Sequence, residues 1–207
     1  MTPDEIEKLF SRGDGSYLFA RWGRPIVPVV FGVDDNTLSV IKGAIEAVVT
    51  LAGHKMAETD PELGSNLMFF FFREWDELLE LEGFEQMVPE IGDTVQKLKA
   101  RGANQYRFFR FEKTGEIKAG FVFLRMDRAL GAMPAEDLAL AQAVQVILLW
   151  GETAFAERSP LAKLPEGQVV LRPEIASVIA AGYDPMMPGM DQDGAAHSLR
   201  MFARMRG

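Results

Sequence analysis

Leu67-Met68-Phe69-Phe70-Phe71-Phe72 is a run of six apolar residues without any alternation with polar ones. A strand with one face in water alternates apolar and polar side chains, whereas a strand covered on both faces reads as a continuous apolar run. The run therefore predicts a strand at the centre of a sheet.

The residues before this run predict a helix, two strands and a second helix. A capping box that begins at Thr2 starts the first helix. Residues 17–22 and 26–33, which are rich in aromatic and β-branched side chains, are expected to form strands. Apolar residues then recur every three or four positions, which is typical of a helix lying on a sheet. We expect Asn36 to cap that helix and Gly53 to end it.

The residues after the run predict further helices, a hairpin that turns at Gly115, and a loop through Glu166 and Gly167. We expect helices at 74–81, 89–99, 135–152, 173–182 and 191–205, and hairpin strands at 105–111 and 117–126. The order of these elements predicts an α/β (α+β) fold, a mixed sheet with packed helices. The length predicts a single globular domain over residues 1–207.

Composition and charge narrow the classes of function. The chain has 207 residues, 48% of them hydrophobic and 25% charged, which is typical of a globular protein. It has no cysteine, so a disulfide framework, a thiolate zinc site, an iron–sulfur cluster and a cysteine nucleophile are excluded. With 22 basic against 30 acidic residues the net charge is −8, which disfavours nucleic acids and anionic membranes as partners.

The sequence predicts a cytoplasmic protein. The first residues, from Met1 to Lys8, carry neither the basic segment nor the apolar segment of a secretory signal. The longest strongly apolar stretch, residues 139–150, is shorter than the roughly 20 residues that a helix needs to cross a bilayer. No membrane contact is therefore expected.

Metal ligands are limited by the two histidines of the chain. His54, Glu58 and Asp60 place three potential ligands within seven residues, just after a predicted helix end. The simpler interpretation is that His54 interacts with the dipole at the C-terminus of that helix. His197 lies inside the last predicted helix, where a solvated or packed role at the surface is expected. We keep His54, Glu58 and Asp60 as candidate binding residues and expect no bound metal.

Motifs for nucleophilic and nucleotide chemistry are missing from the sequence. It contains no Gly-x-Ser-x-Gly turn, no Walker loop and no Gly-x-Gly-x-x-Gly loop. The sequence therefore predicts no catalytic residue and no cofactor.

The last third of the chain carries a family resemblance. Residues 137–144, Asp-Leu-Ala-Leu-Ala-Gln-Ala-Val, are similar to a Glu-Glu-Leu-Ala-Gln-Ala-Leu pattern, and Tyr183-Asp184-Pro185 with Pro188-Gly189-Met190 is similar to a Tyr-Asp-Pro and Pro-Gly-Met turn. Both patterns belong to a family of uncharacterised, often lipoprotein-like proteobacterial domains that are distantly related to zincin metallopeptidases. This chain resembles that family from Ala135 onward.

The resemblance implies a scaffold without its metal site. In a working zincin the long central helix carries His-Glu-x-x-His, two imidazoles that bind zinc and a glutamate that activates water. Residues 135–152 contain no histidine. A fold inherited without its catalytic groups is the expectation that follows.

Three hypotheses for the function come from these observations. The leading one is a non-catalytic zincin-like domain that binds a protein or peptide through a surface or groove, which weighs against an enzyme. The alternative is a metal-dependent hydrolase with a non-standard site around His54, Glu58 and Asp60. A third class is a small-molecule sensor, whose sign would be a largely apolar cavity with a few convergent polar groups.

Overall fold

A mixed four-stranded sheet forms the centre of the computed structural model, which describes residues 1–81, 83, 84, 88 and 90–206. The strand order is β2-β3-β5-β4. Strands β2 (Pro28–Phe31), β3 (Leu67–Phe72) and β5 (Ile117–Arg125) run parallel, and β4 (Gln105–Phe111) pairs antiparallel with β5. The fold is therefore α/β, as the sequence predicts.

The apolar run is the inner strand β3, which confirms its predicted place in the sheet. Its alternate side chains are buried on opposite faces, with Leu67 and Phe69 in one core and Phe70 and Phe72 in the other. On the second face the Phe70 ring stacks on Phe123 of β5, with ring centroids 5.2 Å apart. Because both faces are covered, no polar side chain is needed along this strand.

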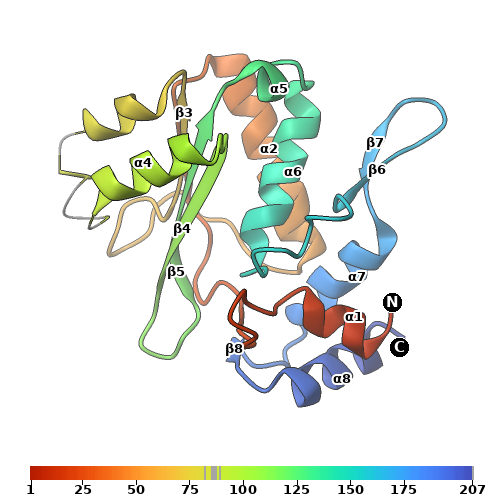
Figure 1. Ribbon diagram of the computed structural model, residues 1–207. Coiled ribbons are helices and arrows are strands. Elements are labelled where there is room, and N and C mark those ends of the chain that lie inside the picture. Colours follow the sequence, from red (N-terminus) through yellow and green to blue (C-terminus); the bar gives the residue numbers. More distant parts are fainter. Residues whose placement is uncertain (82, 85–87, 89, 207) are drawn as a thin grey trace.

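The larger core lies between the sheet and two long helices. Helices α2 (Asp35–Leu51) and α6 (Ala135–Ile147) lie side by side on this face of the sheet (Figure 1). The predicted helix 135–152 ends five residues early, because Leu148 is extended and forms a β-bridge with Arg21. This long-range contact takes the chain out of the helix.

The smaller core covers the other face. It is closed by the 3₁₀ helix η1 (Trp75–Leu79) and by α4 (Ile91–Ala100), seen beside the hairpin in Figure 1. The helix expected at 74–81 is thus a shorter 3₁₀ turn, in which Trp75 and Leu78 are buried. Pro89, the expected start of the next helix, lies outside the described residues.

Most of the remaining elements form a group below the long helices and a projecting hairpin, whereas α5 lies at the upper end of these helices (Figure 1). The bounds are α1 (Pro3–Lys8), β1 (Phe19–Ala20), α5 (Arg128–Gly131), β6 (Leu161–Lys163), β7 (Val169–Leu171), α7 (Pro173–Gly182), β8 (Met190–Asp191) and α8 (Gly194–Arg204). Helix α1, whose capping box at Thr2 is present, packs against α8. The two ends of the chain therefore lie close together (Figure 1).

Three local predictions are wrong and a fourth is incomplete. The pairings of β1 with β8 and of β6 with β7 are contacts that a single sequence does not show, whereas the cap of α2 is a local contact. Strand 17–22 reduces to β1, which pairs with β8 outside the main sheet. Asp34 rather than Asn36 caps α2, since its side chain accepts from the Thr37 N–H. The predicted loop through Glu166 and Gly167 is present, but it is the turn of a short hairpin of β6 and β7, whose strands the sequence does not predict. The last helix begins at Gly194, after β8.

In the part of the chain that the structure describes, no helix is both long enough and apolar enough to span a bilayer. The single-domain expectation stays a prediction.

Gly32, between β2 and α2, tests how tightly the sheet and helix layers are joined. Its φ is +84°, and a Cβ there would lie 2.5 Å from the carbonyl oxygen of Phe71. We expect Gly32→Ala to lower the free energy of unfolding by about 2 kcal/mol, from backbone strain and this overlap.

Gly43, exposed within α2 and without a neighbour that a Cβ would meet, is the matched control. Gly43→Ala should raise the free energy of unfolding by up to about 1 kcal/mol, because alanine favours a helix over glycine. Urea unfolding followed by circular dichroism measures both. Equal midpoints for the two variants would contradict this view of the junction.

Candidate functional site

The three candidate residues of the sequence do not form a metal site. The His54 Nε2 lies 2.9 Å from the carbonyl oxygen of Arg24, and burial lowers the pKa of the imidazole. Glu58 is exposed to solvent. Asp60 is buried and contacts Arg24 through its carboxylate. Among the described residues, no three His, Asp or Glu side chains are grouped so that they could hold a metal ion.

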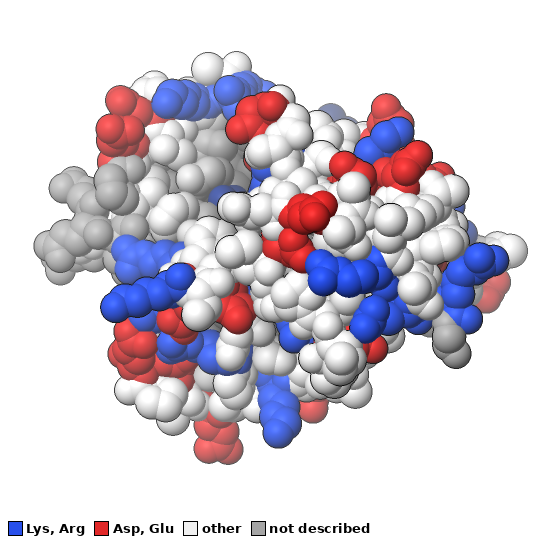
Figure 2. Space-filling view, turned by 90° about the horizontal axis from the view of Figure 1, so that it is seen from below, with Lys and Arg blue, Asp and Glu red and all other residues white. Residues whose placement is uncertain are grey.

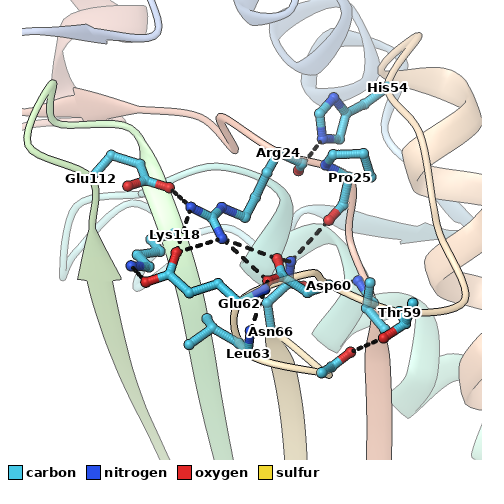
Figure 3. A network of polar contacts seen from close by, with 12 residues as sticks. Arg24, Pro25, His54, Thr59, Asp60, Glu62, Leu63, Asn66, Glu112 and Lys118 are labelled. Carbon is cyan, nitrogen blue, oxygen red and sulfur yellow. Dashed lines mark hydrogen bonds and ion pairs between the residues drawn. The ribbon is translucent and has the colours of Figure 1, made fainter.

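Asp60 is instead the centre of a polar network (Figure 3). Its carboxylate accepts hydrogen bonds from the backbone N–H groups of Glu62 and Leu63, each at 2.9 Å, and from the Asn66 side chain at 3.0 Å. The Arg24 Nη1 donates to both carboxylate oxygens at 3.2 Å. Every side of the carboxylate therefore has a partner, which is typical of a structural group rather than a free ligand.

Arg24 extends this network to the hairpin of β4 and β5. Its guanidinium forms ion pairs with Glu62 and Glu112, and Glu62 also pairs with Lys118 of β5. The contacts join three segments that are distant in sequence. We therefore assign this network to holding the loops below the sheet together.

The electrostatics of Asp60 agree with this assignment. Burial by itself raises the pKa of the carboxyl, but hydrogen bonds from Leu63, Glu62, Arg24 and Asn66 outweigh it and lower the pKa to about 2. Because this is below the value of 3.8 in an unperturbed chain, the native structure holds the charged form. The carboxylate thus stabilises the fold above about pH 4.

Asp60→Asn should lower the free energy of unfolding by about 1–3 kcal/mol at neutral pH, because the replaced oxygen no longer serves its donors. The folded-state pKa is the lower one, so the contribution of Asp60 is lost as the pH falls from about 4 through 2. The difference between wild type and variant should narrow over that range. Denaturant unfolding at several pH values measures it.

Glu58→Gln is the control, two residues away and exposed. It should change stability by less than about 0.5 kcal/mol. A difference between Asp60→Asn and wild type that stays constant from pH 7 to pH 2 would contradict the linkage.

The surface role expected for His197 is wrong, because the side chain is fully buried. Its Nδ1 lies 2.6 Å from the Tyr17 hydroxyl, and its ring packs on Phe19 at 4.3 Å. Burial lowers the pKa to about 4, so the imidazole is neutral at physiological pH. The residue lies on the inner side of α8, four positions before the buried Met201, and belongs to the core.

A mostly apolar cavity of about 470 Å³ lies between α2 and α6. This apical pocket is lined by Ile41, Phe69, Phe71 and Leu138, with polar groups from Asp34, Thr37 and Gln142. Because Phe71 and Gly32 stand at the ends of β3 and β2, the pocket opens near the carboxyl ends of parallel strands, where α/β proteins often bind ligands.

A second, more open cavity of about 590 Å³ lies beside the hairpin. This lateral cleft is lined by Arg107, Phe109 and Phe111 of β4, by Gln145 of α6, and by Trp150 and Phe155. Trp150 and Phe155 meet edge to face with ring centroids 5.0 Å apart. The walls of the cleft are therefore mainly aromatic.

Arg107 is the one charged group of β4 that faces the lateral cleft. Its Nη2 donates to the side-chain oxygens of Gln105 at 2.8 Å and of Gln142 at 2.5 Å. Gln142 is almost fully buried among the apolar side chains of α6, and it also donates to Gln105 at 3.0 Å. Two neutral amides thus hold the guanidinium in place.

Strand β4 has a free edge beside this cleft. It is the outermost strand of the sheet, and it pairs only with β5 among the described strands. The Arg125 N–H donates to the Asn104 carbonyl oxygen, and along an antiparallel pair successive residues alternate between bonding to the neighbouring strand and facing away from it. The N–H and C=O groups of Gln105, Arg107 and Phe109 therefore face away from β5. A row of backbone donors and acceptors is therefore open to a partner.

Neither the cleft nor Arg107 is among the candidates from the sequence. The signal available was the strand 105–111, Gln-Tyr-Arg-Phe-Phe-Arg-Phe, which has arginine and phenylalanine on each face. A strand with one wet face would separate these types. The mixture indicates a face that is neither core nor open surface.

Charged side chains do not separate by sign on the face shown in Figure 2. Lysine and arginine lie next to aspartate and glutamate there. This face thus offers no broad basic surface of the kind that phosphate backbones bind.

No protein-family model, no curated protein and no solved structure matches this chain. The assignment of a function therefore rests on the geometry of the two cavities and of the β4 edge.

Proposed function

We propose that this protein is a binding module without catalytic residues of its own, and that its partner is a peptide segment that adds as an extra strand to β4. The observation that carries the proposal is the free edge of β4 beside the lateral cleft. In strand addition, main-chain hydrogen bonds supply affinity and pockets for alternate side chains supply specificity. Both parts are present at this edge.

The side chains along the edge favour a bound partner over an exposed strand. Phe111 is 42% exposed and Phe109 lines the cleft. Natural edge strands prevent unwanted pairing by being short, by carrying proline or charged side chains, or by bulges. β4 has seven residues without proline or lysine, and its protection is limited to two arginines and a bulge between Arg110 and Phe111. An aromatic edge of this kind is expected where a partner covers it.

Arg107 favours a foreign peptide over a second copy of the chain. Antiparallel pairing of two β4 strands about a two-fold axis at Arg107 places the Arg107 residues of the two copies opposite each other. Like charges across strands are destabilising. An extended peptide with acidic or neutral residues has no such conflict.

Phe109 allows a sharp test, because its N–H faces away from β5. A peptide is first selected from a displayed random library on the wild-type protein. Phe109→Pro should then weaken its binding about tenfold beyond Phe109→Ala, since both variants lose the ring but only proline loses the outward donor. Fluorescence anisotropy with the labelled peptide measures both affinities.

Proline is tolerated on an edge strand where its missing N–H faces outward, so the β4–β5 ladder should survive. Amide resonances of β5 in heteronuclear NMR spectra check that it does. Equal affinities of Phe109→Pro and Phe109→Ala, or a wild-type protein that forms β4-paired dimers instead, would refute strand addition.

The apical pocket supports a second candidate, the binding of a small apolar molecule. Its lining is largely apolar with three polar side chains, Asp34, Thr37 and Gln142, which is the pattern typical of ligand pockets. The Thr37 hydroxyl donates to Asp34 at 3.2 Å, so these two groups lie together at one end.

Ala139→Phe should fill the apical pocket, because Ala139 is buried in its lining. With decanol as the probe, saturation-transfer NMR should show at least tenfold weaker binding to this variant than to wild type. Phe109→Ala, in the lateral cleft, is the control and should bind decanol as wild type does. Equal binding by all three proteins would remove this candidate.

The hydrolase alternative and the zincin-like ancestry stay predictions from the sequence. His54 and Asp60 are both engaged by Arg24, and Glu58 points to solvent. Because His54 and Asp60 are occupied in holding loops and Glu58 lies apart from them, we favour binding over hydrolysis.

A further inference from the structure

Arg107 carries a charge that nothing in its surroundings balances. Among the described residues, no aspartate or glutamate forms an ion pair with it, whereas Arg12, Arg24 and Arg125 each have a carboxylate partner. Its hydrogen bonds go to the neutral oxygens of Gln105 and Gln142. Both bonds use Nη2, and the enclosed Nε has no partner at all.

The burial of this charge costs free energy. Burial lowers the pKa of Arg107 to about 10, so the guanidinium still carries its proton at neutral pH. A buried charge without a counterion loses its hydration and gains little in return. An anion brought into the cleft would recover part of that cost.

The other charges of the lateral cleft leave Arg107 as its single excess charge. Arg12 lies 3.6 Å from Glu152 and donates to the Trp150 carbonyl oxygen at 3.1 Å. The opposite charges of Arg12 and Glu152 therefore cancel. The cleft therefore presents one positive charge among aromatic walls, which matches a group of charge −1 better than a phosphate dianion.

We infer that the lateral cleft binds a carboxylate through Arg107. The inference rests on the proposed function: the added peptide presents either an acidic side chain or its own C-terminal carboxylate to the guanidinium. Nη1, which takes no part in the bonds to the two glutamines, is the donor left for it. Gln105 and Gln142 are positioning residues that hold the guanidinium.

Two small probe molecules of similar shape separate the contribution of negative charge to binding from that of shape. Phenylacetate and phenylacetamide differ only in carboxylate against amide. Titrated into the protein and followed by heteronuclear NMR, phenylacetate should shift the resonances of Phe109, Gln145 and Trp150 and the Arg107 Nε signal. It should bind at least tenfold more tightly than the amide, which is about 1.4 kcal/mol. Equal affinities of acid and amide would overturn the inference.

Two variants test the residue itself. Arg107→Met keeps the length of the side chain without its charge, and should lower the affinity for phenylacetate to that of the amide. Arg107→Lys keeps the charge and should retain part of the preference for the acid, which serves if the methionine variant folds poorly. Arg110→Met, on the other face of β4, is the matched control and should bind as wild type. Wild-type affinity in both Arg107 variants would overturn the inference.

Short peptides distinguish the two sources of the carboxylate. Acetyl-Val-Phe with a free carboxyl end, the same peptide as an amide, and acetyl-Glu-Phe-amide are compared. Preference for the first supports capture of a chain end, and preference for the third supports capture of an acidic side chain. If neither binds more tightly than the neutral peptide, the inference fails.

The inference and the proposed function fail separately. If Arg107 binds carboxylates but the Phe109 experiment shows no strand addition, the anion site is supported and the proposed peptide-binding function is refuted. Strand addition by peptides without any preference for a carboxylate would keep the function and remove this inference.

Discussion

The pairing of β3 with β5 is the contact on which the rest of the structure depends. Phe69 and Val122 lie opposite each other in the larger core, and Phe70 and Phe123 in the smaller one, so a single register places both cores. A slip by one residue would exchange the faces of a strand. The long helices, the 3₁₀ turn and the hairpin all pack against this pair, and the cavities are the spaces that they leave at its margins.

The position of a strand within the sheet decides which of its residues are free to act. β3 is enclosed along both edges, and its side chains mainly pack, apart from Phe69 and Phe71, which also line the apical pocket. β4 is paired on one edge, and each of its faces carries both arginine and phenylalanine, so its side chains serve neither core completely. An inner strand stabilises the sheet, while an edge strand has unpaired backbone groups and partly exposed side chains that a partner can contact. β4 is therefore the strand suited to binding a partner, and β3 the strand that stabilises the fold.

Much of the fold could be predicted from the sequence, because the features concerned are local. The apolar run of β3, the capping box at Thr2 and the turn at Gly115 each depend on neighbouring residues, and the structure has all three. The end of α6 depends on a bridge between Leu148 and Arg21, which are far apart in the chain, so the sequence does not predict it.

The candidate site likewise depends on contacts between residues that are distant in sequence. Asp60 can be recognised as a candidate from its neighbours in sequence. Its ion pair with the distant Arg24, which occupies the carboxylate, is seen only in the structure. Arg107 gave no local motif, because what distinguishes it is the absence of a counterion in three dimensions.

The packing of α1 against α8 brings the first and last helices together, while the β6–β7 hairpin projects from the body at a turn through Gly167 (Figure 1). Neighbouring ends and an exposed turn are the two conditions under which a circularly permuted chain folds. A short linker between the present ends, with new ends opened at that turn, would keep β3, β5 and the long helices in their order. The architecture thus depends on which elements pack against each other, and a permuted chain with its ends at that turn is expected to adopt the same fold.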